Sequence, residues 1–303
     1  MSIADKTLVI VTGPTASGKT ALAIGLARAL QCEIISADSR QVYRRIPIVT
    51  AAPDAEQLAA APHHLVGFLE PEESYSAAAF DADVSRLLPR LWEHSDYVVM
   101  CGGSMMYIDA FVNGLDNLPD IPPTLRDSVW RLFDEGGLPA LHDKLRELDP
   151  GYLATADPVN HKRLIHAIEV SIQAGVPYSS LLTGNRREHP FSIVKLALAP
   201  ERAELFARIG RRVDRMLAEG LEDEARALYP LRGLNSLNTV GLKEMFLYFD
   251  GCMSLQQAAD KIARNTRVYA KKQLTWLKRD PSVIYIPADA DPLTYSLSII
   301  NEE

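Results

Sequence analysis

The chain has 303 residues, 47% of them hydrophobic and 23% charged, and a formal net charge of −7, which is typical of a globular protein. No stretch reaches the roughly 18 consecutive apolar residues that a membrane helix needs, and the N-terminus lacks the basic segment and cleavage site of a secretory signal. The cysteines Cys32, Cys101 and Cys252 lie far apart, which argues against a zinc site and a disulfide framework. We expect a cytoplasmic protein without membrane contact.

The first elements are a strand, a glycine-containing loop and a helix. Thr7 to Thr12 (TLVIVT) is β-branched and apolar, as a buried parallel strand should be, and Ala21 to Leu30 has helix composition. Between them, GPTASGKT satisfies the P-loop pattern G-x-x-x-x-G-K-[ST] in full. A simple turn that caps a helix would not require the final Lys-Thr pair.

Such a loop binds phosphate through backbone N–H groups, the helix dipole and a lysine charge. The predicted phosphate-binding residues are Gly13, Pro14, Thr15, Ala16, Ser17, Gly18, Lys19 and Thr20. The hydroxyl of Thr20 is of the type that binds Mg²⁺.

Polar residues follow two further predicted strands. Asp38-Ser39-Arg40-Gln41 comes after Glu33 to Ala37, and Gly102-Gly103-Ser104 comes after Tyr97 to Cys101. Such positions, at the carboxyl ends of parallel strands, are where α/β sheets place their sites. Asp38 is a candidate general base or Mg²⁺-organising carboxylate, and equally a cap of the next turn. Ser104 could contact a phosphate oxygen or cap the next helix.

One feature of common P-loop ATPases is missing. Their Walker-B strand ends in an aspartate that organises Mg²⁺, whereas strand Tyr97 to Cys101 is followed by Gly102-Gly103. This favours a P-loop that holds a diphosphate for a transfer other than hydrolysis.

The middle of the chain predicts helices only. After a helix at Ser76 to Trp92, helical segments cover 124–135, 139–148 and 158–174, with no convincing strand between Leu118 and Glu188. A strand resumes at 191–199, and a last strand covers 283–286. We therefore predict a P-loop NTPase-like α/β core, a parallel sheet flanked by helices, from residues 1–117 and 189–303, with a helical insertion domain at 118–188.

Helices dominate after the resumed strand. We expect them at 201–219, in a second segment that ends at about residue 229, at 241–249 and at 255–278. The first carries Arg208, Arg211 and Arg212, a further candidate site. The last lies in a segment, Lys261 to Arg279, with seven basic and no acidic residues. The segment carries +7 and the whole chain −7, so the remainder carries −14.

Arg264, Arg267 and Lys271 share one face of this basic helix, and Tyr269 and Trp276 indicate an apolar face. A solvated charged helix is one interpretation. The complete lack of acidic residues favours the other, a surface for a phosphate backbone.

Five segments together resemble the tRNA dimethylallyltransferases, also called tRNA isopentenyltransferases. They are GPTASGKT, ISADSRQVYR, PHHL, CGGSMMY and TRVYAKKQLTWLKRD, in the family's order from about residue 8 to residue 281. The resemblance implies transfer of the dimethylallyl group from dimethylallyl diphosphate to N6 of adenosine 37 in tRNA. It also implies Mg²⁺ as cofactor, a P-loop core with a helical insertion, and the bacterial type of enzyme.

The resemblance assigns roles to matching residues. The P-loop would bind the diphosphate, with Lys19 as its main charge and Thr20 or Ser17 near Mg²⁺. Arg212, or Arg208, would clamp the phosphates from the opposite side. Asp38 would act as general base, and Ser104 stands where the family has a Thr or Ser at the reaction centre.

The tRNA partner would be held at its anticodon stem-loop. The implied tRNA-binding residues are Asp38, Ser39, Arg40, Gln41, Ser104, Arg126, Lys162, Arg163, Leu164, Ile165, His166, Arg264, Arg267 and Lys271. His166 stands where the family usually has an arginine. We expect the protein to act as a monomer.

Three other functions fit part of the sequence. A P-loop small-molecule kinase would bind ATP and would not need the basic helix. An adenylate isopentenyltransferase would prenylate a free nucleotide. An RNA-binding module without activity would not need Lys19, Asp38 and Ser104, which are all present.

Overall fold

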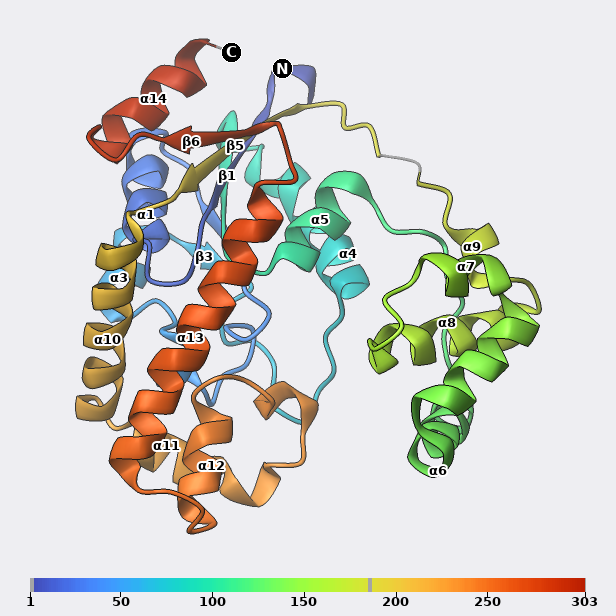
Figure 1. Ribbon diagram of the computed structural model, residues 1–303. Helices are drawn as coiled ribbons and strands as arrows, with labels where there is room; N and C mark the ends of the chain where they lie inside the picture. The colour runs from blue at the N-terminus through green and yellow to red at the C-terminus, as the bar shows by residue number, and fades with distance from the viewer. Residues whose placement is uncertain (1–2, 185–186, 303) are drawn as a thin grey trace. The chain divides into compact units, whose positions relative to one another are not determined.

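The computed structural model describes residues 3–184 and 187–302. Its six strands form one parallel sheet in the order β3-β2-β4-β1-β5-β6 (Figure 1). Their bounds are β1 Thr7–Thr12, β2 Ile34–Ser36, β3 His63–His64, β4 Tyr97–Cys101, β5 Ser192–Leu198 and β6 Val283–Ile286. This confirms the predicted parallel α/β core. The edge strand β3 was not predicted, because two histidines lack the β-branched pattern of a buried strand.

Helices cover both faces of the sheet because the central strands are apolar on both sides. On β1, Leu8 and Ile10 pack with α4 and α5, whereas Val9 and Val11 pack with α1 and α14. The bounds are α1 Lys19–Ala29, α3 Ala55–Ala60, α4 Ala77–Leu91, α5 Met105–Asn113 and α14 Pro292–Glu302. Helices α3, α5 and α14 have no counterpart among the predicted segments.

A second apolar core lies among the later helices. It joins residues of α10, α11, α12 and α13 with the segment around α2. The bounds are α2 Pro47–Thr50, α10 Arg202–Ala218, α11 Leu221–Leu228, α12 Leu242–Phe249 and α13 Leu255–Leu277, all but α2 close to the predicted segments. Helices α10 and α13 pack against each other, and α13 runs from the sheet to α12 (Figure 1).

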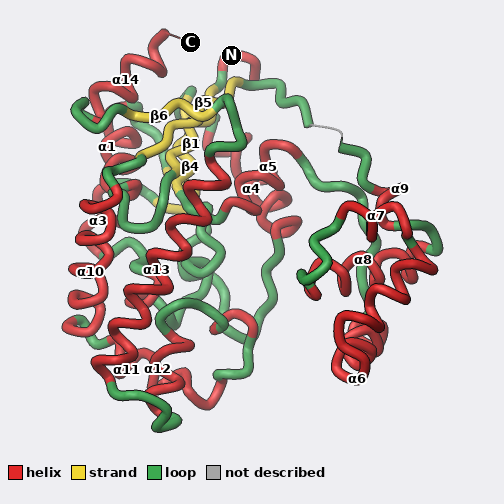
Figure 2. Tube along the Cα trace, viewed as in Figure 1, coloured by secondary structure: helices red, strands yellow, loops and turns green. Residues whose placement is uncertain are grey.

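Residues 113–187 form a separate compact unit, against the expected bounds of 118–188. Its described residues contain helices and no strand (Figure 2). Gly137, with φ 62°, breaks the first helix into two parts, as the two predicted segments require. Val129, Leu141 and Leu164 belong to its core. The bounds are α6 Pro123–Leu148, α7 Pro150–Thr155, α8 His161–Ala174 and α9 Tyr178–Leu181.

The two crossings between the core and the helical unit are joined by hydrogen bonds. Within the core unit, Nε2 of His189 lies 3.0 Å from the carbonyl oxygen of Val112. Within the helical unit, the backbone N–H of Arg187 donates to the carbonyl of Asn113 at 2.9 Å. The outgoing and returning chain segments therefore lie side by side.

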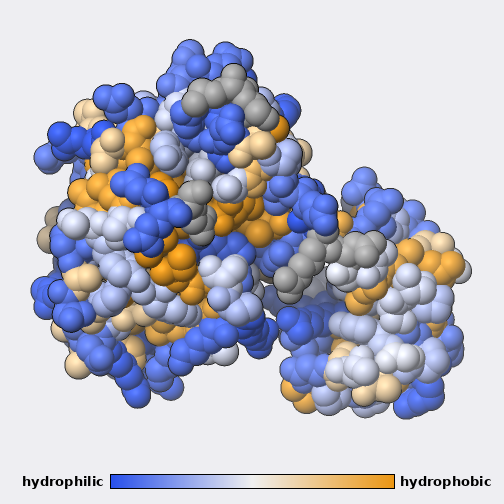
Figure 3. Space-filling model, turned by 90° about the horizontal axis from the view of Figure 1, so that it is seen from above, coloured by the Kyte–Doolittle hydropathy of each residue, from blue (hydrophilic) through white to orange (hydrophobic). Residues whose placement is uncertain are grey.

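The surface is mostly hydrophilic on the face shown in Figure 3, with apolar patches between the polar residues. Within residues 3–184 and 187–302, no helix combines the length and apolarity needed to cross a membrane.

Candidate active site

The P-loop folds where β1 meets α1, and two of its glycines are required by its shape. Gly13 has φ 140° and Gly18 has φ 101°, a region that L-residues rarely adopt. A Cβ on Gly13 would also lie 2.5 Å from the carbonyl oxygen of Leu198. The first N–H groups of α1, which begins at Lys19, have no partner within the helix, so the loop presents donors for an anion.

Lys19 is held by its own loop. Its Nζ donates to the carbonyl oxygen of Pro14 at 2.7 Å. Burial lowers the pKa of Lys19 to about 8, and the nearby Arg212 adds to the decrease. Cys101 and Asp38 oppose the decrease. A desolvated ammonium is stabilised further by an anion such as a diphosphate.

Ser17 carries an unsatisfied buried hydroxyl. Its side chain is 4% exposed, and its Oγ makes no hydrogen bond within the described part of the chain. Buried polar atoms without partners are rare, so this oxygen fits a ligand that the loop would hold. Together with the Thr20 hydroxyl, it offers the hard oxygen atoms that Mg²⁺ prefers.

Two of the three predicted arginines of α10 reach this loop. Arg208 donates through NH1 to the carbonyl oxygen of Ser17 at 3.1 Å. Arg212 donates to the Thr15 hydroxyl at 3.2 Å and to the carbonyl oxygen of Thr50 at 3.1 Å. Arg211 is exposed and does not line the cavity described below. Burial lowers the pKa of Arg212, and the nearby Asp38 opposes this decrease.

Asp38 both caps a turn and faces the site. Its Oδ1 accepts backbone N–H groups of Arg40 at 2.9 Å and Gln41 at 3.3 Å. Its Oδ2 accepts no hydrogen bond from the residues that the structure describes. One oxygen therefore fixes the carboxylate, and the other can take a proton from a substrate.

Ser104 links the two predicted polar segments. Its Oγ accepts the backbone N–H of Ser39 at 2.7 Å and donates to the Ser39 hydroxyl at 3.1 Å. Its carbonyl also accepts the first N–H groups of α5, from Tyr107 and Ile108. Ser104 therefore holds the turn that contains Asp38 next to the start of α5.

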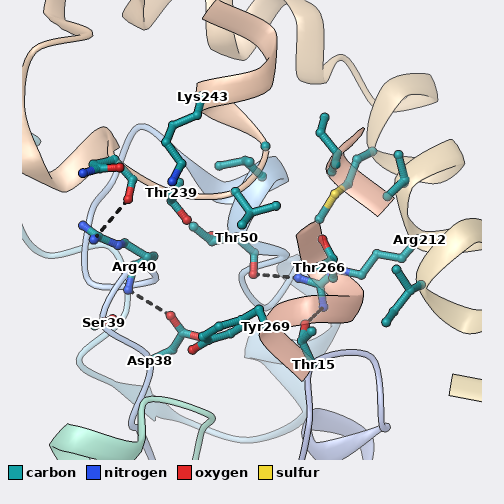
Figure 4. Close-up of a pocket in the computed structure, with 18 residues that line it drawn as sticks. Thr15, Asp38, Ser39, Arg40, Thr50, Arg212, Thr239, Lys243, Thr266 and Tyr269 are labelled. Atoms are coloured by element: carbon teal, nitrogen blue, oxygen red, sulfur yellow. Dashed lines mark hydrogen bonds between the residues drawn. The ribbon is translucent and has the colours of Figure 1, made fainter. Parts of the chain in front are cut away.

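A cavity of about 300 Å³ opens beside Asp38 and Arg212 (Figure 4). Asp38 is the one carboxylate among its lining residues, against the cations Arg40, Arg212 and Lys243. The positive excess suits a polyanionic substrate. The cavity also has apolar lining residues, which are Val49, Ile209, Val213, Met216 and Ile262.

The sequence does not predict the place of three residues in this region. Lys243, from α12, points into the cavity (Figure 4), and no local pattern signals it. Tyr269 lines the cavity, contrary to its expected place on an apolar face, and its hydroxyl donates to the carbonyl of Gly103 at 3.3 Å. Burial raises its pKa to about 12, so the phenol stays protonated. Gln273 lies one turn further along α13. The i, i+4 spacing of Tyr269 and Gln273 was the available signal.

The side chains of Arg40 and Gln41, expected to bind tRNA, are engaged by main-chain oxygens. Arg40 donates to the carbonyls of Asn235 at 3.0 Å and Ser236 at 2.8 Å. Gln41 donates to the carbonyl of Thr50 at 3.2 Å. Both side chains therefore hold the loops around the cavity.

In the helical unit, two of the residues expected to bind tRNA have buried side chains. Leu164 and Ile165 are 0% and 2% exposed and belong to the unit's core, which leaves their side chains no surface for RNA. Helical periodicity explains the difference, because a run of five consecutive residues must place some on the buried face. Lys162, Arg163 and His166 are exposed.

Arg126 lies within the same unit, with its Nε 3.5 Å from Oε1 of Glu169. The Arg126 side chain is 55% exposed and Glu169 is buried. His166 stacks edge-on against Tyr178, and desolvation by the surrounding protein lowers its pKa. A lowered histidine pKa makes it a poorer cation than the arginine that the family usually has.

The predicted cations of α13 lie on a different face from its cavity-lining residues. Ile262, Thr266 and Tyr269 line the cavity at i, i+4 and i+7. Arg267 and Lys271 instead lie over the ring of Phe206 on α10, at 5.5 and 5.9 Å from its centroid. Arg202 of α10 lies over the same ring at 5.2 Å, so α10 extends the basic surface.

Comparison with known proteins identifies the family of this chain. The family model described as IPP transferase matches residues 41–280. The chain is 49% identical to tRNA dimethylallyltransferase 2 of Parabacteroides distasonis, over 93% of this chain and 94% of that protein. It is 47% identical to tRNA dimethylallyltransferase 1 of Phocaeicola vulgatus, over 93% and 94% of the two chains.

Solved structures show the same architecture. The crystal structure of a tRNA isopentenylpyrophosphate transferase from Bacillus halodurans is 38% identical, with a TM-score of 0.71, and the match covers 98% of this chain and 95% of that one. A eukaryotic dimethylallyltransferase acting on tRNA has a TM-score of 0.85 at 21% identity, over 98% and 79%, which shows a shared fold. With a matching family model and relatives near half identity over almost the whole chain, this protein belongs to the IPP transferase family.

Proposed function

We propose that the protein transfers the dimethylallyl group from dimethylallyl diphosphate to N6 of adenosine 37 in tRNA and releases diphosphate. The observation that carries this proposal is one juxtaposition. Arg212 bonds to the P-loop through Thr15 and lines the same cavity as Asp38. An anion site and a base therefore share one cavity, as a prenyl transfer to an amine requires.

The bond changes follow from this arrangement. The bond between C1 of the dimethylallyl group and the bridging oxygen breaks, and its electron pair stays on the diphosphate. The N6 lone pair forms the new bond to C1, and Asp38 accepts the N6 proton. Lys19, Arg208 and Arg212 stabilise the charge that develops on the leaving diphosphate. The apolar lining residues of the cavity accommodate the five-carbon group.

Mg²⁺ fits the residues of the P-loop. Within the described ranges, no group of three His, Cys, Asp or Glu side chains could hold a metal ion by itself. Mg²⁺ is commonly bound by one or two protein oxygens together with substrate phosphates, and Ser17 and Thr20 would supply hydroxyl oxygens here. When bound, the ion would neutralise part of the diphosphate charge.

The acceptor is proposed to be the anticodon stem-loop of tRNA, bound by a monomer in the cytoplasm. The basic surface of α10 and α13 and the exposed Lys162 and Arg163 support a phosphate-backbone partner. The target base has to leave the loop stack to reach a cavity of this size. Orientation of the weakly nucleophilic amine by Asp38 then matters as much as proton removal.

The names of the relatives favour a tRNA acceptor over a free nucleotide or a kinase substrate. The decisive experiment measures transfer of radiolabel from dimethylallyl diphosphate to unmodified tRNA with adenosine at position 37 and Mg²⁺ present. Label in that tRNA, and none when position 37 is changed, is the expected result. Transfer of phosphate from ATP to a small acceptor, without labelled tRNA, would overturn the proposal.

A further inference from the structure

Helix α13 reaches the P-loop through one buried amide. Gln273 is 2% exposed, and its Oε1 accepts the backbone N–H of Thr15 at 2.8 Å. Its Nε2 donates to the carbonyl oxygen of Gly103 at 2.9 Å. One orientation of the amide meets a donor and an acceptor at the same time, so the contact has a defined geometry.

The two partners of this amide belong to different parts of the site. Thr15 is a P-loop residue whose hydroxyl accepts a hydrogen bond from Arg212. Gly103 precedes Ser104, which places Asp38 through Ser39. Gln273 therefore joins the anion-binding loop to the turn that positions the base.

The small size of Gly103 has a specific reason. A Cβ there would lie 2.3 Å from Nε2 of Gln273, so a side chain would displace the amide. At Gly102 a Cβ would lie 2.1 Å from the carbonyl oxygen of Ala37. The two glycines make room for contacts within the protein, one of which is the amide of Gln273.

We propose that Gln273 is a positioning residue for the transfer reaction. It holds the Thr15 backbone so that the P-loop keeps its shape for the diphosphate. It also fixes the position of that loop relative to the turn before Ser104. Because Gln273 belongs to α13, the P-loop geometry depends on the placement of the helix that carries Arg264 and Lys271. The inference rests on the proposed function, in which the P-loop holds the donor.

The test compares Gln273→Met, which keeps the length of the side chain and removes both hydrogen bonds, with Asn265→Ala. Asn265 also ties α13 to a neighbour, through Oε1 of Glu244 at 2.7 Å, but does not line the cavity or contact the P-loop. We expect Gln273→Met to raise the KM for dimethylallyl diphosphate about tenfold and to weaken binding of inorganic pyrophosphate with Mg²⁺ by a similar factor. The Kd for tRNA should not change, and Asn265→Ala should lower Tm alone.

A second variant reaches the same contact from the other side. Gly103→Ala pushes away the end of the Gln273 side chain and should reproduce the donor-specific loss, even if Gln273→Met does not fold. Donor KM and pyrophosphate affinity within twofold of wild type in the folded variants would overturn the inference. Pyrophosphate titration does not need the transfer reaction, so wild-type protein that fails to label tRNA would reject the proposed function separately.

Discussion

Nζ of Lys19 donates to the carbonyl oxygen of Pro14, so the charged residue of the P-loop is held by the loop itself. This contact supplies one neutral acceptor, and desolvation of the ammonium by the surrounding protein lowers the pKa of Lys19 to about 8. Diphosphate binding replaces a weak partner by a strong one.

Donor binding should therefore depend on pH around that value. Below pH 8 Lys19 is charged in the free protein, and above it the amine must gain a proton when the anion binds. Pyrophosphate affinity at constant Mg²⁺ should fall between pH 8 and 9.5, approaching tenfold per pH unit. Cys101, whose pKa burial raises to about 11, does not titrate in this window. Calorimetry in two buffers of different ionisation enthalpy measures the proton uptake. A flat affinity profile would contradict the assigned role.

Asp38→Asn separates chemistry from folding better than an alanine does. Asparagine keeps Oδ1 as acceptor for the N–H groups of Arg40 and Gln41, so the turn is retained. The variant should lose about 10²- to 10⁴-fold in kcat, the usual size of general-base catalysis, while tRNA binding is kept. Single-turnover kinetics and filter binding measure the two quantities. Unchanged turnover would remove Asp38 as the base.

Lys19 and Asp38 show which parts of the site can be predicted from the sequence. The shape of the P-loop and the place of Asp38 were predictable because both depend on local spacing: a glycine with positive φ, a lysine at the start of a helix, a carboxylate after a strand. The core strands were predictable for the same reason, since their apolar runs are continuous. Lys243 was not, because it acts across a contact between segments far apart in the chain that no local pattern marks. For Gln273 the spacing from Tyr269 indicated a shared helix face, but not its partners Thr15 and Gly103, which lie far away in the chain. The burial of Leu164 and Ile165 follows from helical periodicity, which places part of any run of consecutive helix residues on the core side.

Ser17→Ala should act on the metal and leave the fold intact. The Ser17 hydroxyl is buried and unpartnered within the described residues, so its removal should leave Tm unchanged or slightly higher. The Mg²⁺ concentration for half-maximal activity should rise several-fold. Magnesium titrations of wild type and variant, with chelator-treated protein as the zero point, provide the comparison. An identical Mg²⁺ requirement would show that Ser17 does not contribute to the metal site.

Neutralising Arg264, Arg267 and Lys271 together should weaken tRNA binding and reduce its salt dependence. Each phosphate that the variant no longer neutralises lowers the slope of log K against log salt by about one. Because these cations lie on a different face from Ile262, Thr266 and Tyr269, pyrophosphate affinity should be retained. Binding measured at a series of salt concentrations gives the slope. An unaltered slope would make the α13 cations structural only.

Two variants of the helical unit test the buried placement of Leu164 against the exposed placement of Lys162. Leu164→Ala removes a fully buried side chain and should cost about 2–5 kcal/mol in stability. Lys162→Ala, on the exposed side of the same helix, should leave stability within about 0.5 kcal/mol and weaken tRNA binding. Denaturant unfolding and tRNA titration of both variants distinguish the two roles. Equal stability of the two variants would contradict the buried placement.

The hydrogen bond between His189 and Val112 joins the two points at which the chain leaves the core and returns to it. The two ends of the excursion meet, so the continuity of the sheet does not depend on how many residues lie between them. The helices of residues 113–187 therefore leave and re-enter the core at one point, and none of the six strands of the sheet lies among them.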